Sequence, residues 1–131
     1  MFHEYEESEE MKKIAQRLIK KFRELGYISV DEILFLSEKR LQPNALARCY
    51  NLSNHPIGYF TDKMFCIVFY ESLMHYMSEE QRILLMFHEL KHIGRNGKMN
   101  EHSVQDFREI LDIDTHWSDR GVKVPNLLKR K

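Results

Sequence analysis

A capped and almost fully apolar helix is predicted near residues 78–93, and this segment constrains the fold more than any other. Ser78 and Gln81 have the spacing of a capping box, in which the two side chains satisfy the first turn of a helix. Gly94 and Gly97 are expected to end this helix. Because a helix that is apolar on most of its circumference has to be buried, we expect it in the middle of the domain. Its apolar residues are Ile83, Leu84, Leu85, Met86, Phe87, Leu90 and Ile93.

Short apolar segments predict that this helix packs against a small sheet. Residues 30–36, 45–52 and 63–70 are rich in β-branched and apolar side chains, as strands are. An earlier helix is predicted from its N-cap, Ser8, to Gly26, because apolar residues recur there at helical spacing. Residues 101–111 are expected to form a further helix, whereas residues 117–131 have no clear pattern. The predicted fold class is α+β, with a mixed or antiparallel sheet packed against the central helix.

The length and charge of the chain limit its domain count and its partners. With 131 residues and 43% hydrophobic residues, the chain is expected to be one domain, with an N-terminal helix within residues 1–28 and a basic tail at 117–131. Lys+Arg and Asp+Glu both total 20, so overall charge does not favour nucleic acid or a membrane. The lysines and arginines between Lys12 and Arg23 are expected to be the solvated face of the first helix, and nucleic-acid binding there is the alternative.

Two cysteines and the N-terminal sequence indicate the compartment. Cys49 and Cys66 are too few for a disulfide framework and lie in apolar runs, so we expect buried free thiols in a reducing compartment. The first ten residues lack the basic and apolar regions of a signal peptide. No apolar run approaches the roughly 20 residues that a membrane span needs. These features predict a cytoplasmic protein.

The pentapeptide His88-Glu89-Leu90-Lys91-His92 falls at the end of the predicted central helix. Residues four apart lie on the same face of a helix, so the two imidazoles could bind one metal ion. A glutamate between two such histidines is typical of helical zinc hydrolases, where it is the general base. The pattern predicts that His88 and His92 bind one zinc ion and that Glu89 is the catalytic residue.

A catalytic zinc site needs a third protein ligand. His102 is the first candidate, because the nine residues that separate it from His92 allow a turn across the metal. Asp106 lies one helical turn later and could support a ligand imidazole or be the third ligand itself. Glu101 and Glu109 are weaker candidates. The remaining histidines have no motif context and are expected to be structural or exposed; they are His3, His55, His75 and His116. No oxyanion stabiliser is favoured among the candidates, which are Tyr50, Tyr59, Tyr70, Tyr76 and His116.

Several motifs occur in an order that resembles a known family. The segments are ILFL, ALARCYNL, MFCIVFY, SEEQ, FHELKHI and HSVQDF. In this order they resemble the putative phage metallopeptidases, small single-domain zincins of phage, prophage and archaeal genomes, over residues 33–111. The resemblance implies a zincin-like fold with His88, His92 and His102 on zinc. The chain departs from the family at Lys91, where an apolar residue is usual, and in the polar turn GRNGKMNE.

The expected function is a zinc-dependent metalloendopeptidase that cleaves an intracellular protein, such as a phage or prophage protein in the host cytoplasm. In zincins generally, an edge strand beside the active helix aligns the substrate, and MFCIVFY or its neighbour is the candidate here. Two alternatives stay open at this point. The chain could be a catalytically silent metal-binding regulatory protein, or a nucleic-acid-associated protein that uses the basic helix face and tail.

Overall fold

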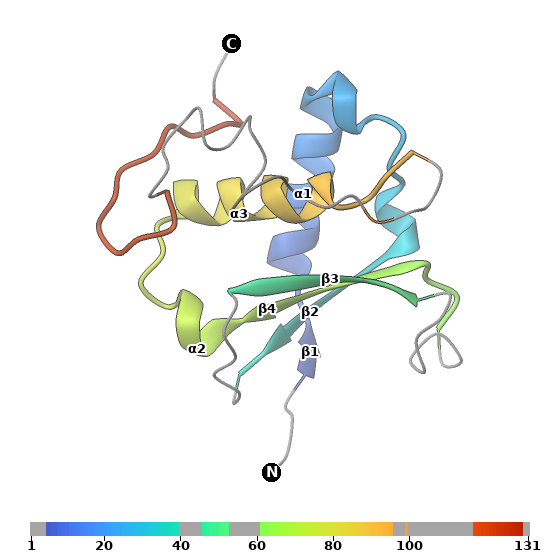
Figure 1. Cartoon of the computed structure of the whole chain (residues 1–131), viewed down its shortest axis with the longest axis horizontal. Helices are drawn as coiled ribbons and strands as arrows, with labels where there is room; N and C mark the ends of the chain where they lie inside the picture. Colours follow the sequence, from blue (N-terminus) through green and yellow to red (C-terminus); the bar gives the residue numbers. More distant parts are fainter. Residues whose placement is uncertain (1–4, 40–45, 53–60, 96–98, 100–116, 130–131) are drawn as a thin grey trace.

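A mixed sheet with two long helices on one of its faces forms the core of the molecule (Figure 1). The structure, a computed structural model, describes residues 5–39, 46–52, 61–95, 99 and 117–129. The helices α1 (Glu9–Lys21) and α3 (Glu79–Lys91) pack against each other and against the sheet. A short helix, α2 (Glu71–Met74), links the sheet to α3. This arrangement confirms the predicted α+β class.

The sheet has four strands in the order β1-β2-β4-β3. Their bounds are Tyr5–Glu7 for β1, Ile33–Glu38 for β2, Ala47–Asn51 for β3 and Phe65–Tyr70 for β4. The pair β2 and β4 is parallel, and the other two pairs are antiparallel. All six residues of β4 are buried because the strand lies between two others and its sequence, FCIVFY, is apolar on both faces.

The position of β4 corrects one expectation. The edge strand that aligns a substrate is expected in MFCIVFY or its neighbour, and of these two β4, which holds most of MFCIVFY, is internal. Its neighbour β3 is an edge strand, as is β1 at the other side of the described sheet. Strand order depends on contacts between distant segments, and the apolar composition of MFCIVFY fits an internal strand better than an edge.

The N-terminal part of the chain also differs from its prediction. Residues 5–7 pair with β2 as a strand, although all three are exposed and carry no apolar alternation. The helix α1 ends at Lys21, and Gly26 has a right-handed φ of −65°, so glycine does not end the helix as expected. The chain leaves the helix at Phe22, whose ring packs against Phe87 of α3 with centroids 5.1 Å apart. The helix therefore ends at an extended residue that packs against α3, and not at a glycine.

The strands predicted from sequence are present with shifted ends. Residues 30–32 form a 3-10 turn, and β2 begins only at Ile33. In the other two predicted segments, β3 occupies the central residues of 45–52, and β4 covers the last six residues of 63–70. The helix predicted at residues 101–111 lies outside the described residues. Among the described residues, no helix is long and apolar enough to cross a membrane.

The capping box of α3 is present as predicted. Gln81 N donates to Ser78 Oγ at 3.1 Å, and Ser78 N donates to Gln81 Oε1 at 2.9 Å. Eight of the thirteen residues of α3 are buried, which places this helix over the sheet in the main core. Its C-cap is His92.

Removal of one capping contact should weaken the fold without altering the rest of the helix. We expect Ser78→Ala to lower the free energy of unfolding by about 1 kcal/mol, because the Gln81 amide loses its side-chain acceptor. Urea unfolding monitored by circular dichroism measures this loss. A change below about 0.3 kcal/mol would contradict a stabilising role for the cap.

Candidate metal centre

Three potential metal ligands meet at the C-terminal end of α3. His88 and Glu89 lie in its last turn, and His92 is its C-cap. One ligand atom from each side chain lies within 4.8 Å of the other two. Among the described residues, this is the one group of three or more His, Cys, Asp or Glu side chains that could hold a metal ion. The structure therefore brings together the three residues of the predicted pentapeptide.

The two imidazoles and the carboxylate are closely packed. The rings of His88 and His92 have centroids 5.1 Å apart with an interplanar angle of 74°. Nε2 of His88 lies 3.5 Å from Oε2 of Glu89, and the side chains of these two residues are 13% and 4% exposed. A carboxylate this deeply buried is stable only when it is paired or hydrogen-bonded. The nearby imidazoles, and a cation bound by them, are suitable partners.

The donor set fits zinc. Two nitrogen ligands at about 2.1 Å from a tetrahedral zinc lie roughly 3.4 Å apart. The ligand atoms of His88, Glu89 and His92 lie within 4.8 Å of one another, and side-chain rotations would have to bring the two imidazole nitrogens to this shorter separation to hold one ion. Neutral imidazole nitrogens are typical zinc ligands, and a site at the end of a buried helix keeps them fixed.

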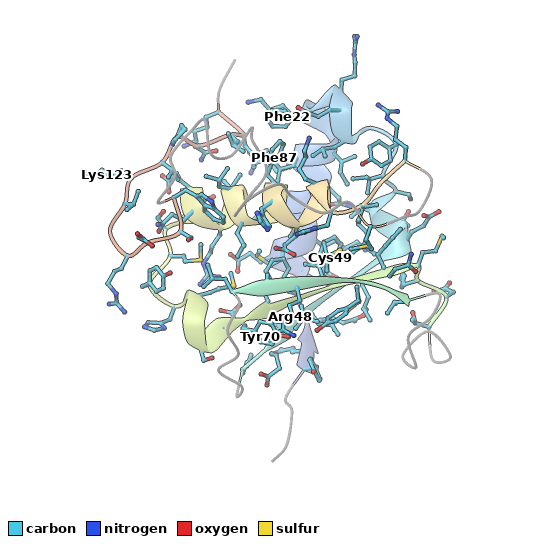
Figure 2. The ribbon with its side chains drawn as sticks, viewed as in Figure 1. Phe22, Arg48, Cys49, Tyr70, Phe87 and Lys123 are labelled. Carbon is cyan, nitrogen blue, oxygen red and sulfur yellow. The ribbon has the colours of Figure 1, made fainter. Side chains whose placement is uncertain are left out.

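A cavity of about 330 Å³ opens next to these residues, between α3 and the edge strand β3. Figure 2 shows Cys49 between β3 and α3, and Arg48 and Tyr70 on the opposite side of the sheet. This alternation follows from the pleat of a strand. The residues that line the cavity are Ala47, Arg48, Cys49, Tyr50, His88, Glu89 and His92.

The electrostatic environment keeps Cys49 a neutral thiol. Burial raises the pKa of Cys49, and the Glu89 carboxylate and the Cys66 thiol raise it further. Cys66 lies on the opposite face of the sheet, where burial raises its pKa to about 11. Both cysteines are free, and Cys66 is buried as predicted, but Cys49 is only half-buried. No sequence pattern indicates that Cys49 lines the same cavity as the histidines, because only strand packing brings it there.

Trp117 is a second residue that the sequence did not indicate. Its indole is buried, and its centroid lies 6.0 Å from that of the His88 ring at an interplanar angle of 39°. The segment around it has no helical or strand periodicity, so a pattern could not place it. Its contact with His88 makes it part of the surroundings of the site.

The other predicted site residues have different outcomes. Eight of these residues lie outside the described part of the chain: His102, Asp106, Glu101, Glu109, Tyr59, His3, His55 and His116. His75 is exposed, with Nδ1 2.9 Å from the Ser72 carbonyl, as expected for a histidine without a motif. The candidates for oxyanion stabilisation are separated by the fold. Tyr76 donates to the Ser118 carbonyl, Tyr70 and Tyr50 share a hydrogen bond, and Tyr50 also lines the cavity.

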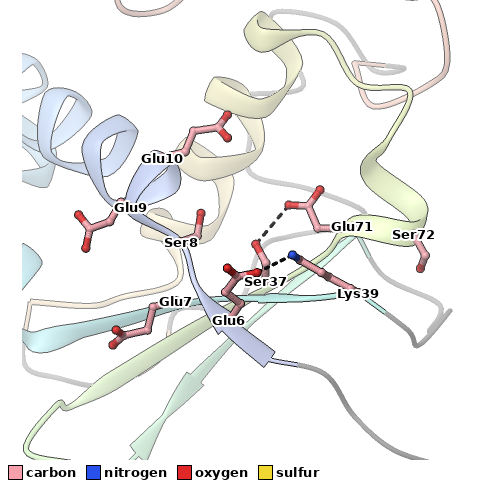
Figure 3. A pocket seen from close by; sticks show the side chains of 9 residues that line it. All are labelled: Glu6, Glu7, Ser8, Glu9, Glu10, Ser37, Lys39, Glu71 and Ser72. Carbon is pink, nitrogen blue, oxygen red and sulfur yellow. Dashed lines mark hydrogen bonds and ion pairs between the residues drawn. The ribbon is translucent and has the colours of Figure 1, made fainter.

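A larger cavity, of about 630 Å³, lies elsewhere on the molecule and has different chemistry (Figure 3). Its acidic side chains are partly neutralised, since Lys39 pairs with Glu6 at 2.5 Å and Arg82 with Glu71 at 3.6 Å. Carboxylates, hydroxyls and one lysine line it, without an imidazole or a thiol. The cavity beside α3 is therefore the better candidate for a zinc site. The residues of the acidic cavity are Glu6, Glu7, Ser8, Glu9, Glu10, Ser37, Lys39, Glu71 and Ser72.

Comparison with known proteins identifies the family and supplies no individual relative. Searches of curated proteins and of solved structures found no match. A family model described as "Putative phage metallopeptidase" matches residues 3–130. The match extends the resemblance seen at residues 33–111 to almost the whole chain, and the family description agrees with a hydrolase that uses a metal. The chain belongs to the putative phage metallopeptidase family.

Proposed function

We propose that the protein is a zinc-dependent endopeptidase that hydrolyses peptide bonds of an intracellular protein, with a zincin-like arrangement of its site. One observation carries this proposal: two imidazoles and a buried carboxylate converge on a cavity beside an edge strand. The family description supports it, since it names a metallopeptidase.

The proposed zinc ligands are His88, His92 and His102. Asp106 is proposed as a hydrogen-bond partner of a ligand imidazole or as the alternative third ligand. The described residues that flank the segment 100–116 support this assignment. Met99 forms a β-bridge with Ile93, just after α3, and Trp117 packs beside His88. Met99 and Trp117, the described residues on either side of this segment, therefore both lie beside the C-terminal half of α3, which carries the histidine pair.

Glu89 is the proposed general base. When bound, zinc acidifies a water molecule and polarises the scissile carbonyl group. The Glu89 carboxylate would accept the proton of the attacking water and transfer it to the leaving amine nitrogen. Its position next to His88 Nε2 and its burial support this role, because a nearly water-free environment strengthens the interaction of the carboxylate with a proton.

The β3 edge is the proposed binding surface for the substrate. Among the described strands β3 pairs only with β4, and the cavity lies between β3 and α3. An extended peptide could add to this edge through backbone hydrogen bonds and so pass in front of the histidine pair. The peptide side chains would then alternate between the cavity and solvent, with Cys49 and Tyr50 among the residues they meet.

Metal analysis tests the proposed site. We expect the purified protein to bind one zinc ion per chain. His92→Ala should lower zinc affinity by more than about 100-fold, which is the largest loss expected when only a hydrogen-bond partner of a ligand is removed. His75→Ala is the matched control, because His75 is an exposed histidine at the end of α2 and does not line the cavity. Competition with a chelating dye measures the affinities. Zinc binding that is equal in both variants would contradict the site.

A further inference from the structure

The C-terminal part of the chain is fixed to α3 by an unusual set of contacts. Residues 117–129, here called the strap, have no regular secondary structure. Three consecutive carbonyl groups at the start of the strap accept hydrogen bonds from side chains. Gln81 Nε2 donates to the carbonyls of Trp117 at 3.0 Å and Asp119 at 2.8 Å, and Tyr76 Oη donates to that of Ser118 at 2.6 Å.

Further contacts hold the same segment. The guanidinium of Arg120 lies over the Tyr76 ring, 5.1 Å from its centroid. Nearer the end of the strap, Lys21 of α1 donates to the Leu127 carbonyl at 2.6 Å, and the Leu127 side chain is buried. The strap is therefore attached at both of its ends. Gln81 itself is only 1% exposed, and its hydrogen bond to the Trp117 carbonyl is buried.

These contacts determine where the Trp117 indole lies. The indole packs beside the His88 ring, and the His92 ring lies 5.1 Å from His88. His88 is thus in contact with two rings, and its side chain is 13% exposed. An imidazole enclosed in this way has few rotamers available, so its orientation is set before any ligand arrives.

We propose that Gln81 and Tyr76 are positioning residues that hold the Trp117 indole against His88 and thereby orient this imidazole for metal binding. The inference rests on the proposed function, in which His88 binds zinc. Gln81 has two separate roles: its Oε1 caps α3, and its Nε2 holds the strap. Both roles belong to one amide group in the first turn of α3. The strap that this group holds carries Trp117, which packs beside His88 in the last turn of the same helix.

A substitution at Gln81 can separate these two roles. Gln81→Glu keeps a side-chain acceptor for Ser78 N, since glutamate also forms capping boxes, but a carboxylate cannot donate to the two carbonyls. Ser78→Ala is the matched control, because it weakens the cap and leaves the strap contacts unchanged. We expect Gln81→Glu to lower zinc affinity about tenfold, within the range for groups that support a ligand, and Ser78→Ala to leave it within about twofold.

Trp117 provides an independent readout, because it is the one tryptophan of the chain. Its fluorescence maximum should shift to longer wavelength in Gln81→Glu as the indole gains contact with water, and should not shift in Ser78→Ala. A shifted maximum together with wild-type zinc affinity would overturn the proposal. So would an equal loss of affinity in Ser78→Ala, since helix stability alone would then explain the effect.

A second pair of variants covers the case in which Gln81→Glu does not fold. Trp117→Leu removes the aromatic ring, whereas Trp117→Phe keeps one beside His88. We expect the leucine variant to lose about tenfold in zinc affinity and the phenylalanine variant to recover most of it. Equal affinities in wild type, Trp117→Leu and Trp117→Phe would overturn the proposal.

The failure of the proposed function can be distinguished from the failure of this inference. A wild-type protein that binds no zinc would contradict the metal site. The orientation of His88 can then be measured in the metal-free protein from the imidazole proton resonances, which the nearby indole shifts. We expect this shift to decrease in Gln81→Glu, which keeps the indole but loses the hydrogen bonds that hold it, and to stay unchanged in Ser78→Ala. An unchanged shift in Gln81→Glu would contradict the positioning role.

Discussion

Glu89→Gln is expected to bind zinc normally and to lose peptide hydrolysis by about 10²–10⁴-fold, the range for removal of a general acid–base group. Glutamine has nearly the same shape as glutamate, so the buried position next to His88 can still be filled. Its amide cannot accept the proton of the attacking water. Mass spectrometry of a peptide library incubated with each protein measures cleavage, and the chelating-dye assay measures zinc.

Glu79→Gln is the matched control for this experiment, since it makes the same chemical change in the exposed first turn of the same helix. It should cleave at the wild-type rate. Cleavage by Glu89→Gln at the wild-type rate would show that the proposed mechanism is wrong. A wild-type protein that binds zinc and cleaves no peptide would favour a metal-binding regulatory protein instead.

His102→Ala is expected to have the second large effect, a loss of zinc affinity of at least about 100-fold. Asp106→Ala should lose about tenfold, as expected for a residue that supports a ligand. The physical reason is that zinc with two imidazoles needs a third protein ligand to be held tightly. Competition with the chelating dye for both variants and the wild type makes the comparison.

The two variants together identify the third ligand. A larger loss in Asp106→Ala than in His102→Ala would make Asp106 the ligand. Wild-type affinity in both variants would exclude the two residues from the site. His75→Ala again serves as the control, because it changes a histidine outside the cavity.

Local patterns in the sequence predicted the parts of the fold that local physics determines. The α3 capping box needs only Ser78 and Gln81 at the right spacing, and it is present. The burial of β4 follows from a run of apolar residues. By contrast, β1 consists of three exposed residues whose pairing with β2 is the reason for their conformation. No periodicity marks such a strand.

The same distinction applies to the candidate site. The proximity of His88 and His92 could be predicted because four residues make about one helical turn. Cys49 and Trp117 come from segments distant in sequence. Sheet order brings Cys49 to the cavity, and side-chain hydrogen bonds hold the segment that places Trp117 beside His88. Strand order also determines that β3 lies at an edge of the sheet, and composition alone could not predict this order.

The attachment of the strap has a consequence for the timing of folding during synthesis. Trp117 reaches His88, and Leu127 reaches the core, only after the sheet, α1 and α3 have been translated. Domains form during translation from the N-terminal side, so the sheet and α1 can assemble while the strap is still inside the ribosome. The imidazole of His88 would then gain its final orientation last, and a nascent chain would not yet hold a mature metal centre.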